Sequence, residues 1–137
     1  MGQILLVSHG TMAEGMYKAA GMVFGELPGV SYLCLSEDKG IETFKAELKQ
    51  LLEAQDYEKP LTVLCDIGGG SPYNSTLELL SDRGHLEQSS VVAGMNLPLL
   101  LVLLMAPEAT KETVCRCMEE ARGNMMLFEM QEEDDEL

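Results

Sequence analysis

The sequence predicts an α/β protein with a doubly wound, mainly parallel four-stranded sheet in the order 2-1-3-4. Three observations lead to this prediction: short apolar runs alternate with helical patterns, the apolar runs are continuous rather than alternating, and glycine or proline separates the segments. Continuous apolar runs are typical of parallel strands that are covered on both faces. The 137 residues, 46 % of them hydrophobic, suit one domain with a substantial core.

The first half of the chain predicts two strands, each followed by a helix. "QILLVS" at 3–8 is the first strand, and apolar residues continue at helical spacing over 12–25. "VSYLCL" at 30–35 follows an "LPGV" turn and is the second strand. The segment 40–54 predicts an amphipathic helix whose apolar face carries Ile41, Phe44, Leu48, Leu51 and Leu52.

The second half repeats the pattern, with a strand at 61–66, a helix at 72–81, a strand at 89–94 and a helical segment at 97–122. Ser71 is the expected N-cap of the third helix, and Pro72 its first helical residue. We expect a bend in the last helical segment near Pro107. "MMLFEM" at 125–130 is a possible C-terminal edge strand.

The charge of the chain argues against nucleic acid as a partner, and its apolar segments indicate the expected compartment. The formal net charge is −14 with only nine Lys and Arg, which is unfavourable for binding the phosphate backbone of a nucleic acid. No secretory signal is visible, and the apolar run at 97–106 is too short to span a bilayer, so we expect a cytoplasmic protein. We expect residues 1–128 to form the domain and the acidic residues 129–137 to be a solvated tail.

The four cysteines predict neither disulfides nor a metal site. In a cytoplasmic protein we expect reduced thiols, with Cys34 and Cys65 in the core of predicted strands. Cys115 and Cys117 lie two residues apart in a predicted helix, where such positions do not share a face, and no second pair matches them. We therefore expect no metal and no cofactor.

Two polar residues follow neighbouring strands of the predicted sheet. In the order 2-1-3-4, ligands bind beyond the carboxyl ends of strands one and three, where the strand order reverses. Strand one ends at His9 and strand three ends at Asp66. The sequence therefore predicts that these two side chains lie at the same edge of the sheet, beside two helix N-termini.

His9 has a structural and a functional interpretation. A histidine in a loop is commonly held by ordinary hydrogen bonds and has no further role. Here Gly10 and Thr11 open a helix, whose free N–H groups and dipole favour an anion. A carboxylate at Asp66 would fix the ring tautomer and leave the other ring nitrogen as a nucleophile toward a phosphoryl group. Asp66 has its own simpler role as a cap of the turn that follows its strand.

The segment "DIGGGSPYN" at 66–74 completes the candidate site. Glycine permits positive φ and close approach of the backbone, so Gly69, Gly70 and the Ser71 hydroxyl are candidate phosphoryl-binding groups, together with Gly10 and Thr11. A Ser-His-Asp triad uses the same residue types, but Ser71 lacks the G-x-S-x-G context of a nucleophile elbow. His85 falls at the opposite edge of the sheet and is interpreted as a surface residue.

Three segments together resemble a known family. "ILLVSHGTMAEGM", "VLCDIGGGSPYNS" and "VVAGMNLPLLL" occur in order from about residue 2 to 128. The chain resembles the enzyme IIA domain of the mannose class, including fructose and sorbose types, of the phosphoenolpyruvate-dependent sugar phosphotransferase system. Gly68 stands where many members of this family carry a bulky aromatic residue, so the rim of the site or the partner surface is expected to differ.

The resemblance implies a phosphorelay. His9 would accept a phosphoryl group from the phosphocarrier protein HPr and pass it to an enzyme IIB partner, while Asp66 holds the ring and Ser71 and nearby N–H groups bind the phosphoryl oxygens. It also implies a homodimer that exchanges C-terminal strands, which would give 125–130 a partner. Association with membrane components IIC and IID would be indirect. The chain as given carries no IIB domain, so we expect transfer between separate proteins.

Four alternatives use the same histidine. The phosphotransferase subunit of dihydroxyacetone kinase is related in fold, but favours a different motif after strand three. Histidine phosphatases carry an arginine before the histidine, where this chain has Ser8. Small tetrapyrrole chelatases need a second facing histidine, and His85 would lie at the wrong edge. A regulatory module read in its phosphorylated state stays open, because it would use His9 in the same way.

Overall fold

The computed structural model describes residues 2–131 and contains one parallel sheet with helices on both faces. The elements in chain order are β1 (Gln3–His9), α1 (Met12–Phe24), β2 (Val30–Leu35), α2 (Ile41–Glu53), β3 (Leu61–Cys65), α3 (Ser71–Asp82), β4 (Ser89–Ala93), α4 (Leu97–Met105) and α5 (Lys111–Arg122). The strand order is β2-β1-β3-β4, and every neighbouring pair is parallel. The predicted fold class and strand order are confirmed.

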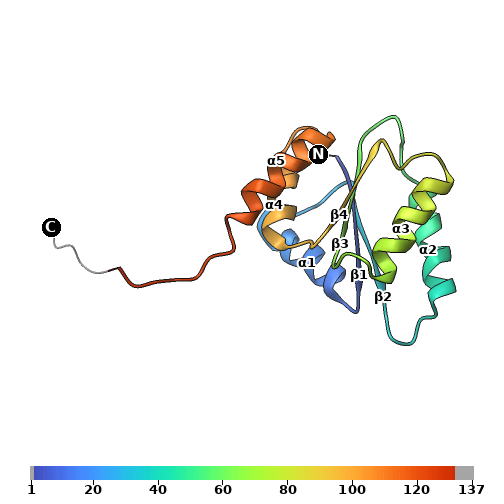
Figure 1. Ribbon diagram of the computed structural model, residues 1–137, viewed down its shortest axis with the longest axis horizontal. Coiled ribbons are helices and arrows are strands. Elements are labelled where there is room, and N and C mark those ends of the chain that lie inside the picture. Colours follow the sequence, from blue (N-terminus) through green and yellow to red (C-terminus); the bar gives the residue numbers. More distant parts are fainter. Residues whose placement is uncertain (1, 132–137) are drawn as a thin grey trace.

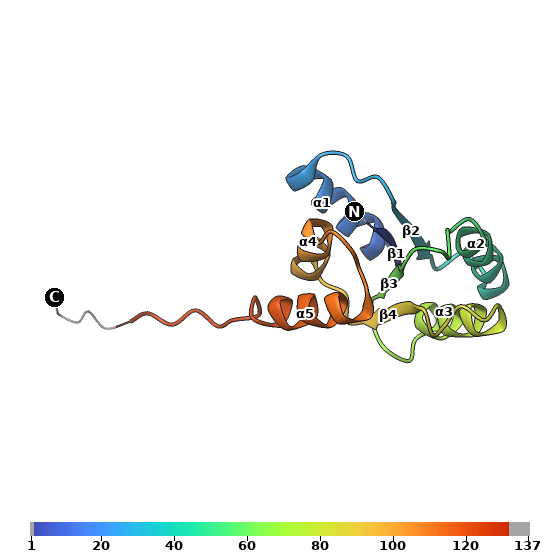
Figure 2. The ribbon, with the colours of Figure 1, turned by 90° about the horizontal axis from the view of Figure 1, so that it is seen from above.

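Helices cover the sheet in two layers. Figure 1 shows α1, α4 and α5 on one face of the sheet and α2 and α3 on the other, and Figure 2 shows the same layers from above. Alternation along β1 sends Ile4 and Leu6 into the first layer, whereas Leu5 and Val7 enter the second. This two-sided burial is the physical reason for the continuous apolar strands in the sequence.

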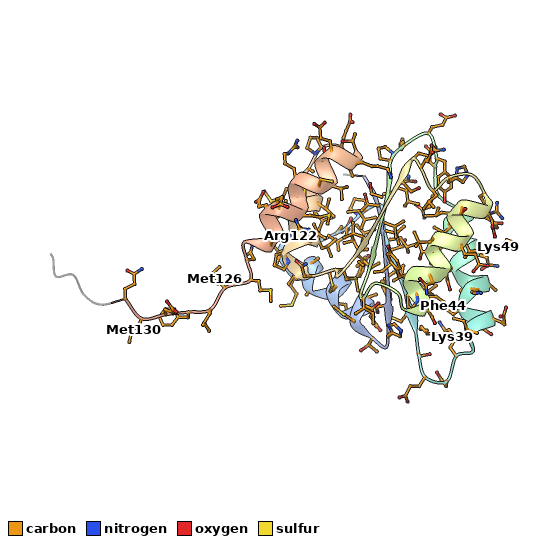
Figure 3. The ribbon with its side chains drawn as sticks, in the orientation of Figure 1. Lys39, Phe44, Lys49, Arg122, Met126 and Met130 are labelled. Atoms are coloured by element: carbon orange, nitrogen blue, oxygen red, sulfur yellow. The ribbon has the colours of Figure 1, made fainter. Side chains whose placement is uncertain are left out.

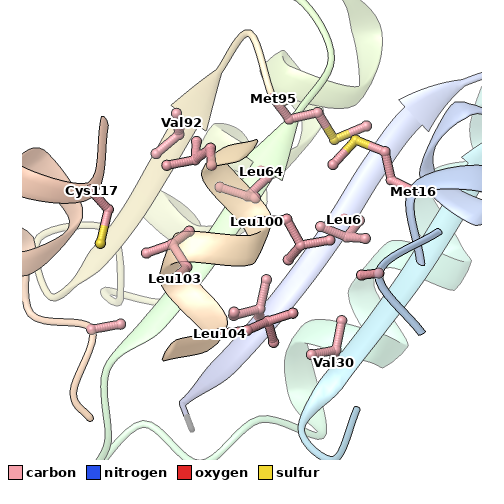
Figure 4. Close-up of a cluster of buried hydrophobic side chains, with 14 of the residues drawn as sticks. Leu6, Met16, Val30, Leu64, Val92, Met95, Leu100, Leu103, Leu104 and Cys117 are labelled. Carbon is pink, nitrogen blue, oxygen red and sulfur yellow. The ribbon is translucent and has the colours of Figure 1, made fainter. Parts of the chain in front are cut away.

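The larger core lies between the sheet and α4. Figure 4 shows Leu6, Leu64 and Val92 of three strands facing Leu100 and Leu103 of α4. Both of these α4 leucines are almost completely buried, and burying one leucine contributes about 1.5–3 kcal/mol. The apolar run that is too short for a bilayer is therefore a core helix, although its last residue, Met105, is exposed. None of the helices within residues 2–131 combines the length and apolar character needed to cross a membrane.

The sequence predicts one bent helix over 97–122, and this prediction is wrong because the structure has two separate helices there. The chain leaves the helical conformation at Ala106, whose ψ is 139°. Steric conflict with the ring of Pro107 favours this extended conformation in the preceding residue. A new helix then begins after Thr110, whose hydroxyl oxygen accepts a hydrogen bond from the Thr113 N–H.

The segment 125–130 forms no strand in the described part of the chain. Its backbone is irregular, and Figures 1 and 2 show it leading away from the sheet. Met125, Met126, Leu127, Phe128 and Met130 are 75–93 % exposed, and Figure 3 shows Met126 and Met130 far from the core. A strand needs a neighbouring edge for its N–H and C=O groups, and this chain places none beside the segment. Of the acidic tail predicted for 129–137, residues 132–137 lie outside the described residues.

Candidate functional site

The two strands that precede His9 and Asp66 lie side by side in the sheet. Val7 of β1 is the register partner of Cys65 of β3, so the residues that follow these positions emerge together at the carboxyl edge. His9 is the last residue of β1, and Asp66 comes directly after β3. The predicted meeting of the two side chains at one edge is therefore what the structure shows.

Asp66 holds His9 at two points. Its Oδ2 atom accepts one hydrogen bond from the His9 backbone N–H and another from His9 Nδ1, each 2.8 Å long. Its Oδ1 atom accepts a third from the Ile67 backbone N–H at 2.9 Å. The Asp66 side chain is only 9 % exposed, whereas the His9 side chain is 45 % exposed. The carboxylate is thus part of the scaffold, and the imidazole is presented to solvent.

The electrostatics of Asp66 fix the tautomer of His9. Burial alone raises the pKa of the Asp66 carboxyl, but the hydrogen bonds from the His9 backbone, the His9 ring and Ile67 outweigh it and hold the pKa below its ordinary value. An ionised carboxylate only accepts hydrogen bonds, so Nδ1 must carry a hydrogen atom. In the neutral ring, the unshared electron pair then resides on Nε2.

Glycine is required where the backbone passes the His9 ring. A Cβ atom on Gly70 would lie 2.8 Å from His9 Cε1 and 3.4 Å from Nε2, closer than the ring can tolerate without moving. Gly69 has a φ of 83° and Gly10 a φ of 56°, in the left-handed region that favours glycine. The Gly10 N–H donates to the Leu35 carbonyl oxygen at 2.8 Å, which fixes the turn beyond β1.

Two helices begin beside His9, and the second is not capped by Ser71 as the sequence predicts. Gly70, in extended conformation, is the N-cap of α3, so the assignment of Ser71 as N-cap is wrong. Ser71 and Pro72 instead form the first turn of the helix, where proline is tolerated because its missing N–H has no intrahelical partner. The exposed Ser71 hydroxyl is therefore not engaged in capping.

The first helix depends on a residue that the sequence prediction did not include. Thr11 is the N-cap of α1, but its side chain makes no capping hydrogen bond. The buried Ser8 hydroxyl oxygen of β1 accepts the Ala13 N–H at 2.8 Å instead. A serine within a buried apolar strand, immediately before a helix, was the available signal in the sequence.

An open depression brings His9 and Ser71 together. The residues that line it are His9, Gly10, Leu35, Ser36, Glu37, Lys39, Ile41 and Ser71. No hydrogen bond joins Ser71 to His9 within residues 2–131, so the arrangement lacks the Ser–His contact of a hydrolytic triad. Of the predicted groups, Gly10 and Thr11 connect β1 to α1, Gly69 and Gly70 lie between β3 and α3, and Ser71 is the first residue of α3. Within this part of the chain, no cluster of three metal-ligating side chains occurs.

The second histidine and the cysteines lie elsewhere. His85 follows α3 at the opposite edge of the sheet, but it is half-buried and stacked on Tyr57 with ring centroids 3.7 Å apart. Its interpretation as a simple surface residue is therefore wrong, because aromatic stacking covers one face of the ring. The four cysteines are free thiols, and burial raises the pKa of Cys65 to about 12. Cys117 is buried and Cys115 exposed, as predicted for two residues on different helix faces.

A family model described as "PTS system fructose IIA component" matches residues 3–121 of the chain. The chain belongs to this enzyme IIA family. The match covers β1 to α5 almost completely, so every element of the candidate site lies within it. This enzyme IIA component is of the mannose class, as the resemblance in its three motifs predicts.

Curated relatives of this enzyme IIA component include mannose-specific, fructose-specific and sorbose-specific proteins. It is 34 % identical over 103 residues to the PTS system mannose-specific EIIAB component of Escherichia coli (strain K12), which covers 75 % of this chain and 31 % of that protein. It is 29 % identical over 108 residues to the PTS system fructose-specific EIIA component of Bacillus subtilis (strain 168), covering 79 % and 72 % of the two chains. The chain thus spans about a third of the length of the Escherichia coli protein that it matches.

Solved structures share the whole architecture of this enzyme IIA component. The mannose/sorbose-specific IIA subunit from Enterococcus faecalis superimposes with a TM-score of 0.83 at 26 % identity, covering 96 % of this chain and 97 % of that chain. A PTS IIA protein associated with the fucose utilization operon of Streptococcus pneumoniae has a TM-score of 0.78 at 29 % identity, with 92 % of each chain covered.

Proposed function

We propose that this enzyme IIA component is a phosphoryl carrier in which His9 holds the phosphoryl group. The observation that carries the proposal is the pair of hydrogen bonds between His9 and Asp66, which directs Nδ1 to a carboxylate and leaves Nε2 as the nucleophile. The half-exposed ring stands at an open depression, where another protein has access to it. A buried histidine would lack that access.

The transfer step is a displacement at phosphorus. The Nε2 electron pair attacks the phosphoryl group of phospho-HPr; the Nε2–P bond forms as the donor's N–P bond breaks, and its electron pair remains on the donor nitrogen. The Nδ1 proton stays on His9, so the phosphorylated ring carries a formal positive charge that the ionised Asp66 stabilises. In a second displacement, a nucleophile of the enzyme IIB partner attacks the phosphoryl group, and the Nε2–P bond breaks with its electron pair remaining on Nε2.

The backbone around His9 is suited to the incoming negative charge. α1 follows β1 and α3 follows β3, so both N-termini lie at the edge of the sheet that carries His9, and first-turn N–H groups, which lack intrahelical partners, carry partial positive charge. We assign phosphoryl binding to the turn of Gly10 and Thr11 on one side and to Gly69, Gly70 and Ser71 on the other. The Gly10 N–H is engaged with Leu35, so Gly10 contributes the shape of the turn and Thr11 its donors. These donors are fixed by the fold before the phosphoryl group arrives, which reduces the reorganisation that transfer requires.

Exposed apolar side chains beside His9 support docking of HPr and enzyme IIB. Met12 is the first residue of α1, Ile41 is the first residue of α2, and Ile67 follows Asp66 directly. All three are exposed, although large apolar side chains are usually buried. Protein interfaces place such side chains at their centre, so these residues would exclude water from the transfer reaction. Gly68, which lacks a side chain, leaves this part of the surface lower than an aromatic residue would.

We also propose a homodimer in which each chain supplies residues 125–130 to its partner. β4 is an edge strand with only β3 beside it, and Ala93, Leu99 and Met118 line a hollow next to it. The apolar, exposed segment 125–130 has the composition of an edge strand. In this proposal residues 1–128 are the IIA-type domain and 129–137 the acidic tail. The protein works in the cytoplasm, and its association with the membrane components IIC and IID is indirect.

The proposed function is tested by following the phosphoryl group after loading. The protein is phosphorylated with phosphoenolpyruvate, enzyme I and HPr, separated from them, and mixed with an enzyme IIB of the mannose class. Loss of label from this protein with gain on enzyme IIB supports the carrier function. Label that persists over the same time without transfer contradicts it and indicates the regulatory module. Sedimentation before and after removal of residues 125–137 tests the dimer, which should dissociate when the segment is absent.

A further inference from the structure

The candidate site contains more negative than positive charge. Asp66 holds the His9 ring, and Glu37 lines the same depression. A phosphoryl group adds roughly −1.5 to −2 charges near neutral pH. The arginines cannot balance it, because Arg83 follows α3 at the other edge of the sheet while Arg116 and Arg122 belong to α5. A cation that balances the charge of the phosphoryl group would therefore have to be a residue other than an arginine.

Lys39 is the single cationic side chain among the residues that line the depression, within the described part of the chain. It lies in the loop between β2 and α2, which begins after Leu35, the register partner of His9. Its N–H donates to the Ser36 carbonyl oxygen at 3.1 Å, so a turn directs the residue back toward the strand ends. Figure 3 shows Lys39 at the start of α2, at the edge of the sheet where the strands end.

In this structure the ammonium group of Lys39 has two partners. Its Nζ atom donates to the Cys34 carbonyl oxygen at 2.9 Å and pairs with Glu47 Oε1 at 2.7 Å. The side chain is 22 % exposed and that of Glu47 is 44 % exposed. The Glu47 Oε1 atom itself is shielded from solvent, but both side chains are partly exposed, and partly exposed ion pairs contribute modest net stability. Because the Glu47 side chain is 44 % exposed, its carboxylate can turn to water when Lys39 leaves, so a more highly charged acceptor can take its place.

We infer that Lys39 is a further phosphoryl-binding residue: it leaves Glu47 when His9 is phosphorylated and binds an oxygen of the phosphoryl group. The inference rests on the proposed function of His9. A phosphoryl dianion carries about twice the charge of a carboxylate and three acceptor oxygens, so it competes successfully for the ammonium group. In the unphosphorylated state, Glu47 keeps Lys39 beside the depression with its charge balanced.

The test compares Lys39→Met with wild type after both are phosphorylated. A nearby cation favours the dianionic form of the phosphoryl group, so its loss should raise the pKa of that group, measured by titration with phosphorus NMR. The equilibrium of transfer from phospho-HPr should shift toward HPr by about five- to tenfold. Lys39→Arg, which retains the charge, should restore both values toward wild type. A purely structural role of Lys39 would not move the pKa of the phosphoryl group.

Lys45→Met is the matched control. Lys45 belongs to α2 and pairs with Glu78, as Lys39 pairs with Glu47, but it does not line the depression. It should leave both the phosphoryl pKa and the transfer equilibrium at wild-type values. The inference is overturned when Lys39→Met gives the same two values as wild type and Lys45→Met. If wild type itself takes no label at His9, the proposed function fails first, and the two failures are distinct.

Discussion

Asp66 Oδ2 accepts two hydrogen bonds of 2.8 Å from His9, one from the backbone N–H and one from ring Nδ1. One oxygen atom thus fixes both the end of β1 and the orientation of the imidazole. Since β1 and β3 are neighbours in a rigid parallel sheet, the geometry is present before any partner arrives. Preorganisation of this kind lowers the cost of reaching a productive arrangement for transfer.

Replacement of Asp66 by asparagine should slow phosphoryl transfer by about a hundredfold. The His9 ring would lose the carboxylate that fixes its tautomer and stabilises its positive charge when it is phosphorylated. The chain should still fold, since Asp66 lies beyond the end of β3 rather than inside the core. Asp82→Asn, at the exposed end of α3, is the control and should transfer normally. Rapid-quench labelling from phospho-HPr measures the rates, and an unchanged rate in Asp66→Asn would exclude the orienting role.

The lowered pKa of Asp66 predicts how stability depends on pH. A carboxyl group whose pKa is lower in the folded state stabilises the fold above its unfolded value, near 3.8, and this contribution is lost as the pH falls through the folded value. Urea unfolding should therefore show wild type more stable than Asp66→Asn by about 1–3 kcal/mol at pH 7. The difference should shrink at pH 3 and below. A difference that is independent of pH would contradict this origin.

Gly70→Ala should impair labelling although its backbone conformation suits any residue, with φ of −81°. The added Cβ would lie 2.8 Å from His9 Cε1, so the ring must shift from the position in which Asp66 holds it. Even a small displacement of the reacting imidazole is expected to reduce the rate of phosphoryl transfer by about tenfold or more. Gly21→Ala, toward the C-terminal end of α1, is the matched control, because its Cβ would meet nothing within 4 Å. Equal labelling rates in the two variants would be incompatible with the proposed site.

Ser71→Ala should lower the labelling rate and leave the stability within about 0.5 kcal/mol of wild type. The Ser71 hydroxyl is exposed and makes no capping hydrogen bond, so the fold does not depend on it. The control is Ser81→Ala, an exposed serine at the other end of the same helix. Labelling rates and thermal unfolding are compared for the three proteins. Normal labelling by Ser71→Ala would remove the hydroxyl from the proposed phosphoryl site.

The sheet could be predicted because its strands are buried on both faces. Leu5 and Leu6 point to opposite layers and are both fully buried, so the strand has no polar alternation to obscure it. The strand order then brought His9 and Asp66 to one edge without knowledge of any contact. The segment 125–130 shows the limit of this method: its apolar pattern predicts a strand, but a strand also needs an edge to pair with.

Other parts of the site depend on contacts that spacing along the chain does not encode. The cap of α1 is the side chain of Ser8, five residues before its donor Ala13, rather than a residue at the start of the helix. Ser71 was predicted as N-cap because proline is common in the first helical position, but Pro72 is the second residue of α3. Lys39 reaches the depression only through the pairing of β1 with β2, and its residue type alone gave no indication of a role.

The most direct test of the central claim is the site of phosphorylation itself. Wild type and His9→Ala are incubated with phosphoenolpyruvate, enzyme I and HPr, and intact mass is measured after acid and after base treatment. Wild type should gain the mass of one phosphoryl group in a form that is labile in acid and stable in base, as phosphohistidine is, and His9→Ala should gain none. Full labelling of His9→Ala would contradict the account.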